Sequence, residues 1–148
     1  MTRVLFVCIG NSCRSQMAEG FARAYGGDVI TPASAGHAPA TRVSATTLSV
    51  MEEKNIDLSD HFPKALSHLR RAQFDLVIDM SGVSAPIGIQ APVRVWKVAD
   101  PVAMTYKNHC AIRDEIERLV MGLVLELRRG PLALPAPGES SGSQSQAF

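Results

Sequence analysis

The segment VLFVCIGNSCRS, residues 4–15, determines how the rest of the chain is interpreted. Its first half is a short apolar run with β-branched and aromatic side chains, typical of a strand buried on both faces of a parallel sheet. Residues 10–12, Gly-Asn-Ser, then favour a tight turn. Apolar residues recur at helical spacing from residue 17 to residue 25, and the glycine pair at 26–27 ends that pattern. The chain therefore opens as strand, tight loop and helix.

The rest of the chain alternates between strand and helix patterns. Strands are predicted at residues 29–35, 74–80 and 92–98, and helices at residues 43–55, 64–72 and 112–127. Strands that alternate with helices imply crossover connections and a parallel sheet. We therefore predict an α/β fold, a three-layer sandwich in which a short four-stranded parallel sheet carries helices on both faces.

The 148 residues are enough for one domain, which we expect to span residues 1–129. Residues 130–148 are rich in Pro, Gly and Ser around a single charge, and predict a disordered tail. Fifteen Lys and Arg residues against fourteen Asp and Glu residues do not indicate a nucleic-acid partner. The apolar runs are shorter than the roughly 18–20 residues that cross a membrane. Three cysteines are too few for a disulfide framework, so a reduced, cytoplasmic location is expected.

The first loop carries the strongest chemical signal. Cys8 ends the predicted strand, and Arg14 begins the predicted helix six positions later. The backbone N–H groups between them would converge on one centre, a geometry that binds a tetrahedral oxyanion, and Arg14 adds a two-pronged donor. The same positive field stabilises a thiolate, so Cys8 is predicted to be a nucleophile, with Ser15 donating a hydrogen bond to its sulfur. An ordinary turn with a buried Cys and a surface Arg is the alternative.

Residues 8–15, CIGNSCRS, resemble the phosphate-binding loop of the low-molecular-weight protein tyrosine phosphatase family. The thioredoxin-type arsenate reductases share that fold and loop. Two further motifs follow the family pattern: Ser34-Ala35-Gly36 after the second strand, and Asp100-Pro101 in a late loop. The resemblance covers residues 2–129 and implies a flavodoxin-like fold.

The resemblance also implies roles for individual residues. Cys8 would be the nucleophile, Arg14 would hold the transition state, and Asp100 would be the general acid and later the base. The oxyanion-binding loop would consist of Ile9, Gly10, Asn11, Ser12, Cys13, Arg14 and Ser15. A supporting hydrogen-bond network would consist of Asn11, Ser15, Ser34 and His61.

The other cysteines and histidines are assigned more modest roles. In the phosphatase family a second loop cysteine forms a reversible disulfide with the nucleophile, which implies a redox role for Cys13; the alternative is that Cys13 fills the loop interior. Cys110 is interpreted as incidental. The remaining histidines are interpreted as surface residues: His37, His68 and His109. The spacing of Cys and His matches no metal site, and neither a metal nor a cofactor is expected.

Three features separate this chain from parts of the family pattern. Val102 and Ala103 follow Asp-Pro, where human-type members carry tyrosines, and residues 37–40 lack an aromatic side chain, so stacking on a phosphotyrosine ring would be weaker. Residues 12–20 are more similar to the arsenate reductases. Residues 80–86, however, contain none of the cysteines that thioredoxin-coupled reductases carry there.

These features leave three hypotheses. The first is a Cys-dependent phosphomonoesterase that acts on a phosphorylated protein or a small phosphate ester through a phosphocysteine intermediate. The alternative is an arsenate reductase, in which Cys13 or an external thiol reductant completes the reaction. The third, a non-catalytic oxyanion-binding module, is disfavoured because a nucleophile, an arginine and an acid are all present.

Overall fold

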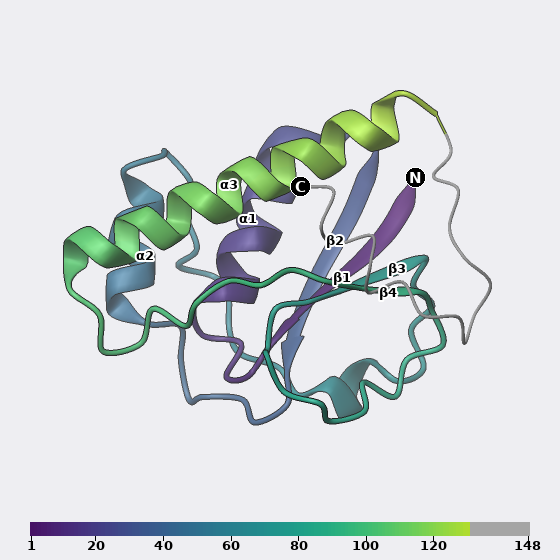
Figure 1. Ribbon diagram of the computed structural model, residues 1–148, viewed down its shortest axis with the longest axis horizontal. Coiled ribbons are helices and arrows are strands. Elements are labelled where there is room, and N and C mark those ends of the chain that lie inside the picture. Colours follow the sequence, from purple (N-terminus) through teal and green to yellow (C-terminus); the bar gives the residue numbers. More distant parts are fainter. Residues whose placement is uncertain (131–148) are drawn as a thin grey trace.

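A four-stranded parallel sheet organises the computed structural model, which describes residues 1–130 (Figure 1). The strands are β1 (Thr2–Cys8), β2 (Ile30–Gly36), β3 (Leu76–Asp79) and β4 (Val93–Val95), in the order β2-β1-β3-β4. The helices are α1 (Arg14–Gly26), α2 (Ala45–Glu52), α3 (Tyr106–Arg128) and the short 3-10 helix η1 (Leu66–Leu69). The predicted parallel α/β fold is confirmed. The predicted tail, residues 130–148, lies outside the described residues apart from Gly130.

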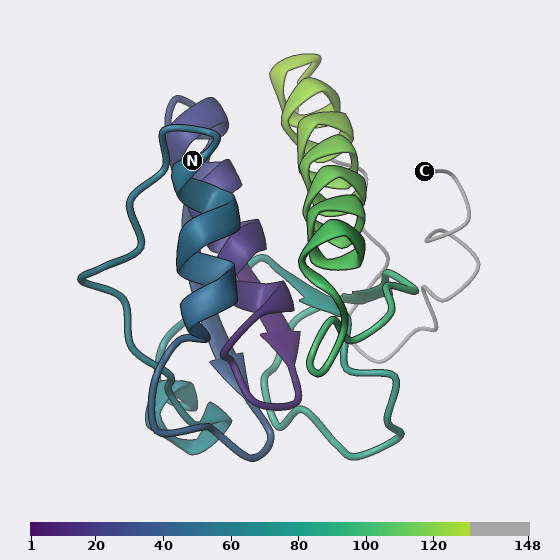
Figure 2. The same ribbon diagram turned by 90° about the vertical axis from the view of Figure 1, so that its left-hand side faces the viewer.

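Strand β1 is one of the two inner strands of the sheet, because it pairs in parallel with both β2 and β3. Its apolar run, residues 4–7, is fully buried, as the sequence predicts. Cys8 stands opposite Gly36 at the ends of β1 and β2. Because the strands are parallel, the loops that follow them leave from the same edge of the sheet. Figure 2 shows the loops after β1 and β2 together at that edge.

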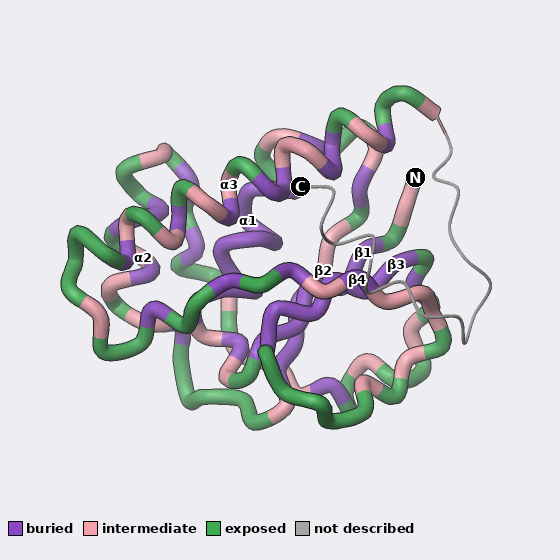
Figure 3. Tube along the Cα trace, in the orientation of Figure 1, coloured by how far each residue is buried: buried purple, intermediate pink, exposed green. Residues whose placement is uncertain are grey.

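The two faces of the sheet are covered differently. Residues of α1, α2 and α3 form the larger core cluster on one face, around Phe6, Phe21 and Trp96. The other face buries a smaller cluster beneath η1 and the segment 87–93. Figure 3 shows the buried residues concentrated in the strands and on the inner sides of the helices. The helical layer expected on this second face is thus reduced to one 3-10 turn and loops.

The element boundaries follow local capping signals. Helix α2 begins two residues later than the predicted 43–55, because the Ser44 hydroxyl accepts from the Thr47 N–H at 3.4 Å and caps its start, and it ends three residues earlier, at Glu52. Helix α3 begins six residues before the predicted apolar stripe, where the Thr105 hydroxyl accepts from the Asn108 N–H at 3.2 Å. Within residues 1–130, no helix combines the length and the apolar character needed to cross a membrane.

Candidate active site

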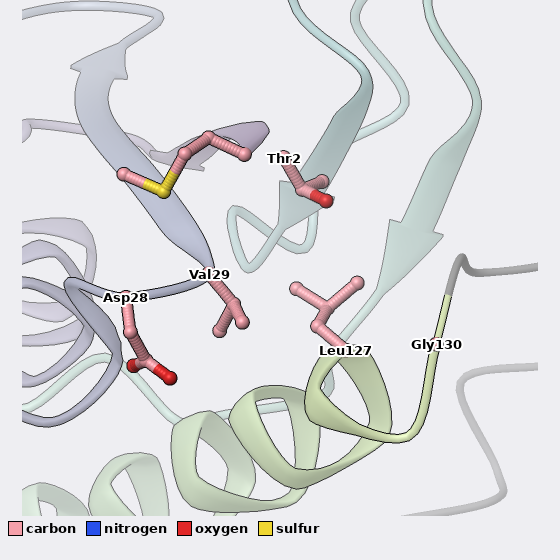
Figure 4. A pocket seen from close by; sticks show the side chains of 6 residues that line it. Thr2, Asp28, Val29, Leu127 and Gly130 are labelled. Atoms are coloured by element: carbon pink, nitrogen blue, oxygen red, sulfur yellow. The ribbon is translucent and has the colours of Figure 1, made fainter.

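A hollow at the amino-terminal edge of the sheet is not the site (Figure 4). It lies beside Thr2, at the opposite end of β1 from Cys8. It contains no cysteine, histidine or arginine. Its lining residues are Met1, Thr2, Asp28, Val29, Leu127 and Gly130. The chemistry predicted from the sequence lies at the other edge.

The β1–α1 loop, residues 9–13, is held from outside by the segment that follows β2. The N–H groups of residues 37, 38 and 40 donate to the carbonyl oxygens of residues 8, 9 and 10, at 3.2, 2.9 and 2.9 Å. A Cβ atom on Gly36 would lie 2.5 Å from the Ile9 carbonyl oxygen, so this close approach requires glycine. Within residues 1–130, the N–H groups of residues 10–13 donate no hydrogen bond to the protein. They are therefore available to an anion.

The Cys8 thiol is buried and contacts one hydroxyl. Its Sγ lies 2.9 Å from Ser15 Oγ. Ser15 Oγ also accepts a hydrogen bond from Asn11 Nδ2 at 2.7 Å. Asn11 adopts the left-handed backbone conformation, with φ of 50°, which asparagine tolerates better than most residues. Because Ser15 accepts from Asn11, its single O–H is left to donate to the sulfur.

Arg14, the first residue of α1, is held beneath the loops that follow β3 and β4. Its Nη1 donates to the carbonyl oxygens of Met80 and Val98, the latter at 3.1 Å. Its Nη2 lies 3.5 Å from Asp100 Oδ2. The guanidinium is almost completely buried, and these acceptors and the carboxylate compensate for the loss of water.

Asp100 is the exposed member of the group. Its side chain is 40% exposed, and its Oδ1 accepts from the Val102 N–H at 3.1 Å, closing a local turn. Ala103 in the same turn has a φ of 63°. The structure thus brings together the predicted nucleophile loop, arginine and acid, although the acid comes from a distant part of the sequence.

Of the predicted supporting network, Asn11 and Ser15 are in direct contact, His61 is connected to them indirectly, and Ser34 contacts none of the three. His61 reaches Asn11 through Gln16, because His61 Nδ1 lies 2.9 Å from Gln16 Oε1. Ser34 donates to Glu19 Oε1 at 2.6 Å, so its hydroxyl is directed to this carboxylate. Burial lowers the pKa of His61, and the nearby Glu19 carboxylate opposes that effect.

Sequence reasoning missed Gln16 and Glu19. Both are buried polar residues of α1 that stand among apolar neighbours. The signal that could have found them is the presence of amide and carboxylate side chains inside a helix whose other residues predict a core face. Glu19 is also paired with Arg23 at 2.7 Å, and it lies 3.8 Å from His61 Nδ1.

Cys13, in the loop, and His109, in α3, both have Thr47 as a neighbour. Burial raises the pKa of the Cys13 thiol, against the effect of hydrogen bonds to side chains that include Thr47 and Ser44. The prediction that His109 is a surface residue is wrong, because the residue is only 2% exposed. Its Nε2 lies 3.0 Å from Thr47 Oγ1, and burial lowers its pKa. Of the other two histidines, His68 is exposed and His37 is partly buried.

The loops that follow the four strands surround the opening of the site, and none of them contains a phenylalanine or a tyrosine. These loops are residues 9–13, 37–44, 80–92 and 96–105. Trp96 is buried and packs against Phe6. Tyr106 lies just beyond the last of these loops, where its hydroxyl donates to Glu53. These loops therefore offer no phenylalanine or tyrosine side chain on which an aromatic substrate ring could stack.

The sequence is similar to that of curated arsenate reductases. The protein called glutaredoxin arsenate reductase in Synechocystis sp. is 31% identical over 131 residues, which cover 86% of this chain and 99% of that protein. Arsenate reductase 1 of Bacillus cereus is 32% identical over 117 residues, which cover 76% of this chain and 87% of that protein.

Solved structures extend the similarity to a phosphatase. An arsenate reductase in the phosphate-binding state is 32% identical with a TM-score of 0.78, and the match covers 85% of this chain and 98% of that one. The YwlE arginine phosphatase from Geobacillus stearothermophilus is 26% identical with a TM-score of 0.70, over 87% and 94% of the two chains. The family model of the low molecular weight phosphotyrosine protein phosphatases matches residues 3–131. The chain therefore belongs to this family.

Proposed function

We propose that the protein is an arsenate reductase in which Cys8 is the nucleophile and an external thiol supplies the second sulfur. The observation that carries this proposal is the combination of an oxyanion loop with an opening that has no Phe or Tyr in its strand-end loops. A small inorganic oxyanion needs no ring-stacking surface, whereas a phosphotyrosine does. The relatives named arsenate reductases support the same choice. This reverses the order of the first two hypotheses drawn from the sequence.

Arsenate would be bound by the free N–H groups of residues 10–13, the positive end of α1 and the Arg14 guanidinium. These donors match a tetrahedral anion because they are fixed before it arrives. The Ser15 hydroxyl stabilises the thiolate of Cys8.

In the first step, the Cys8 thiolate attacks arsenic. A sulfur–arsenic bond forms, an arsenic–oxygen bond breaks, and the departing hydroxide takes a proton from Asp100 and leaves as water. Arsenic keeps its oxidation state in this step, and Arg14 stabilises the charge on the remaining oxygens.

In the second step, a second thiolate attacks the Cys8 sulfur. A sulfur–sulfur bond forms, the sulfur–arsenic bond breaks, and its electron pair passes to arsenic, which leaves as arsenite. Cys8 is then part of a disulfide, and a further thiol restores it by exchange.

Two observations favour an external thiol for the second step. Cys13 is buried and its pKa is raised, so little of it is thiolate at neutral pH. The segment after β3, residues 80–86, contains no cysteine. The partner would therefore be a low-molecular-weight thiol or a dithiol protein such as a glutaredoxin.

The test compares three proteins, the wild type, Cys13→Ser and Cys110→Ser, in arsenate reduction and in aryl phosphate hydrolysis. All three are expected to reduce arsenate with glutathione and glutaredoxin, and to do so weakly with thioredoxin alone. Loss of reduction in Cys13→Ser alone would assign the second step to Cys13. Negligible reduction with every thiol, together with rapid aryl phosphate hydrolysis, would overturn the proposal in favour of a phosphatase.

The phosphomonoesterase remains the second candidate, and Asp100 is the observation that favours it. A phosphate ester needs an acid to protonate its leaving oxygen, and the Asp100 carboxylate lies 3.5 Å from Arg14 at the exposed side of the site. The arginine phosphatase among the structural neighbours also supports this reading.

The variant Asp100→Asn is expected to lower phosphatase turnover by ~10²–10⁴ for substrates with poor leaving groups. The loss should shrink as the leaving group becomes more acidic, because such a group departs without a proton. The measurement is the hydrolysis rate across a series of substituted aryl phosphates. An equal loss along the whole series would indicate that Asp100 acts by holding Arg14 and its own turn.

A further inference from the structure

Gln16 makes four polar contacts around the β1–α1 loop. It is completely buried on the first turn of α1. Its Nε2 lies 3.1 Å from the Asn11 carbonyl oxygen, 3.2 Å from Asn11 Oδ1 and 3.2 Å from the Phe62 carbonyl oxygen. Its Oε1 lies 2.9 Å from His61 Nδ1.

These contacts fix the direction of the hydrogen bonds that lead from His61 to Ser15. Three acceptors surround Gln16 Nε2, so the amide cannot be flipped, and Oε1 must accept from a protonated Nδ1 of His61. Asn11 Oδ1 likewise accepts from the Lys64 N–H at 2.8 Å and from Gln16, so Asn11 Nδ2 must face Ser15. Ser15 then has one hydrogen left, and it faces Cys8.

We propose that Gln16 is a positioning residue, which couples His61 to the nucleophile and keeps the Ser15 hydrogen directed at the Cys8 sulfur. In this row each group donates to the next: His61 to Gln16, Gln16 to Asn11, Asn11 to Ser15, and Ser15 to Cys8. Such aligned donors reinforce one another and favour a negative sulfur at the end of the row. The inference rests on the proposed role of Cys8 as the nucleophile.

A packing role alone would not need the amide. An apolar side chain of equal length would fill the same volume, but it would leave two buried oxygens of Asn11 and the part-buried Phe62 carbonyl oxygen without this donor. The contact with the Phe62 carbonyl also ties the segment before Lys64 to the β1–α1 loop. Without the Gln16 amide, Asn11 Oδ1 keeps the Lys64 N–H as its donor and loses the other of the two donors that orient the side chain.

The charges around His61 leave the row intact over a wide pH range. Glu19 and Asp57 act to raise the pKa of His61, Arg23 and Lys64 act to lower it, and burial is the largest effect and lowers it. Nδ1 carries a hydrogen in the neutral form that Gln16 selects, and also in the protonated ring. His61 therefore donates to Gln16 in both of its protonation states. A change in pH affects the row of hydrogen bonds at Cys8, where it ends.

The experiment measures how fast iodoacetamide alkylates Cys8 as a function of pH, with the modified residue read by peptide mass spectrometry. Gln16→Met keeps the length of the side chain and removes the amide, and Gln16→Glu keeps its shape but places a carboxylate against three acceptors. In both, the pH midpoint of Cys8 alkylation is expected to rise by about one unit, the scale of one weakened hydrogen bond to a charged group. Gln90→Met, at an exposed position, is the matched control and should leave the midpoint unchanged.

The coupling itself is tested by combining variants. His61→Leu should shift the midpoint in the same direction in the wild-type chain and add nothing in the Gln16→Met chain, because the row is already broken. A wild-type midpoint in folded Gln16→Met or Gln16→Glu protein would overturn the inference, and so would full additivity with His61→Leu. If Cys8 of the wild type reacts no faster than in the denatured protein, the nucleophile assignment fails instead, and the proposed function fails with it.

Discussion

The Cys8→Ser variant is expected to lose arsenate reduction and aryl phosphate hydrolysis completely while it continues to bind phosphate. A serine hydroxyl at this position is a far weaker nucleophile than a thiolate, and it cannot form the disulfide that the reduction requires. The anion-binding groups, the N–H groups of residues 10–13 and the Arg14 guanidinium, are unchanged by the substitution. The measurements are both activity assays and calorimetric titration with inorganic phosphate.

The matched control for this variant is Cys110→Ser. Cys110 is half-buried in the first turns of α3, outside the β1–α1 loop, and its loss should leave both activities in place. Turnover near the wild-type rate in Cys8→Ser would remove Cys8 from the reaction. Loss of phosphate binding as well as turnover would indicate that the thiol holds the shape of the loop.

The Arg14→Lys variant is expected to lose activity by ~10²–10³, the effect of removing one preorganised donor from an oxyanion site. Lysine keeps the charge but cannot reproduce the planar fork, which contacts the Met80 and Val98 carbonyl oxygens and the Asp100 carboxylate together. The loss should appear mainly in kcat, because the charge that draws the anion in is retained. Steady-state kinetics with arsenate and with an aryl phosphate measure it.

Arg70→Lys provides the control, since Arg70 is an exposed arginine that follows η1 on the other side of the sheet. Its kinetics should match the wild type. If Arg14→Lys also retained the wild-type kcat, the guanidinium would have no role beyond holding the loops after β3 and β4.

The place of the β1–α1 loop could be predicted because the sequence pattern that determines it is local. An apolar run, a turn and a helical pattern follow one another within residues 4–25, so the places of Cys8 and Arg14 follow from the order of the residues. Asp100 is different, because only the resemblance to a family pointed to it. Its approach to Arg14 depends on the return of the chain through β4, which no local pattern contains.

The residues that were missed depend on tertiary contacts. Gln16 and Glu19 are buried because the segment around His61 and the end of β2 close over the first turns of α1. His109 is buried because α3 begins earlier than predicted. The added residues place His109 on the same buried face of the helix as the later apolar residues. In each case the sequence predicts an exposed polar side chain, and a distant part of the chain buries it.

The position of Asp100 has a consequence for how this enzyme scaffold can diversify. The loop that carries Asp100 and Val102 is largely exposed, whereas Cys8 and Arg14 belong to the central strand and the innermost helix. Substitutions in that exposed turn remove little buried apolar surface, so mutational drift there costs little folding stability. On the proposed roles of these residues, substitutions in this turn would change which leaving group is protonated, while the β1–α1 loop that would bind the anion stays unchanged.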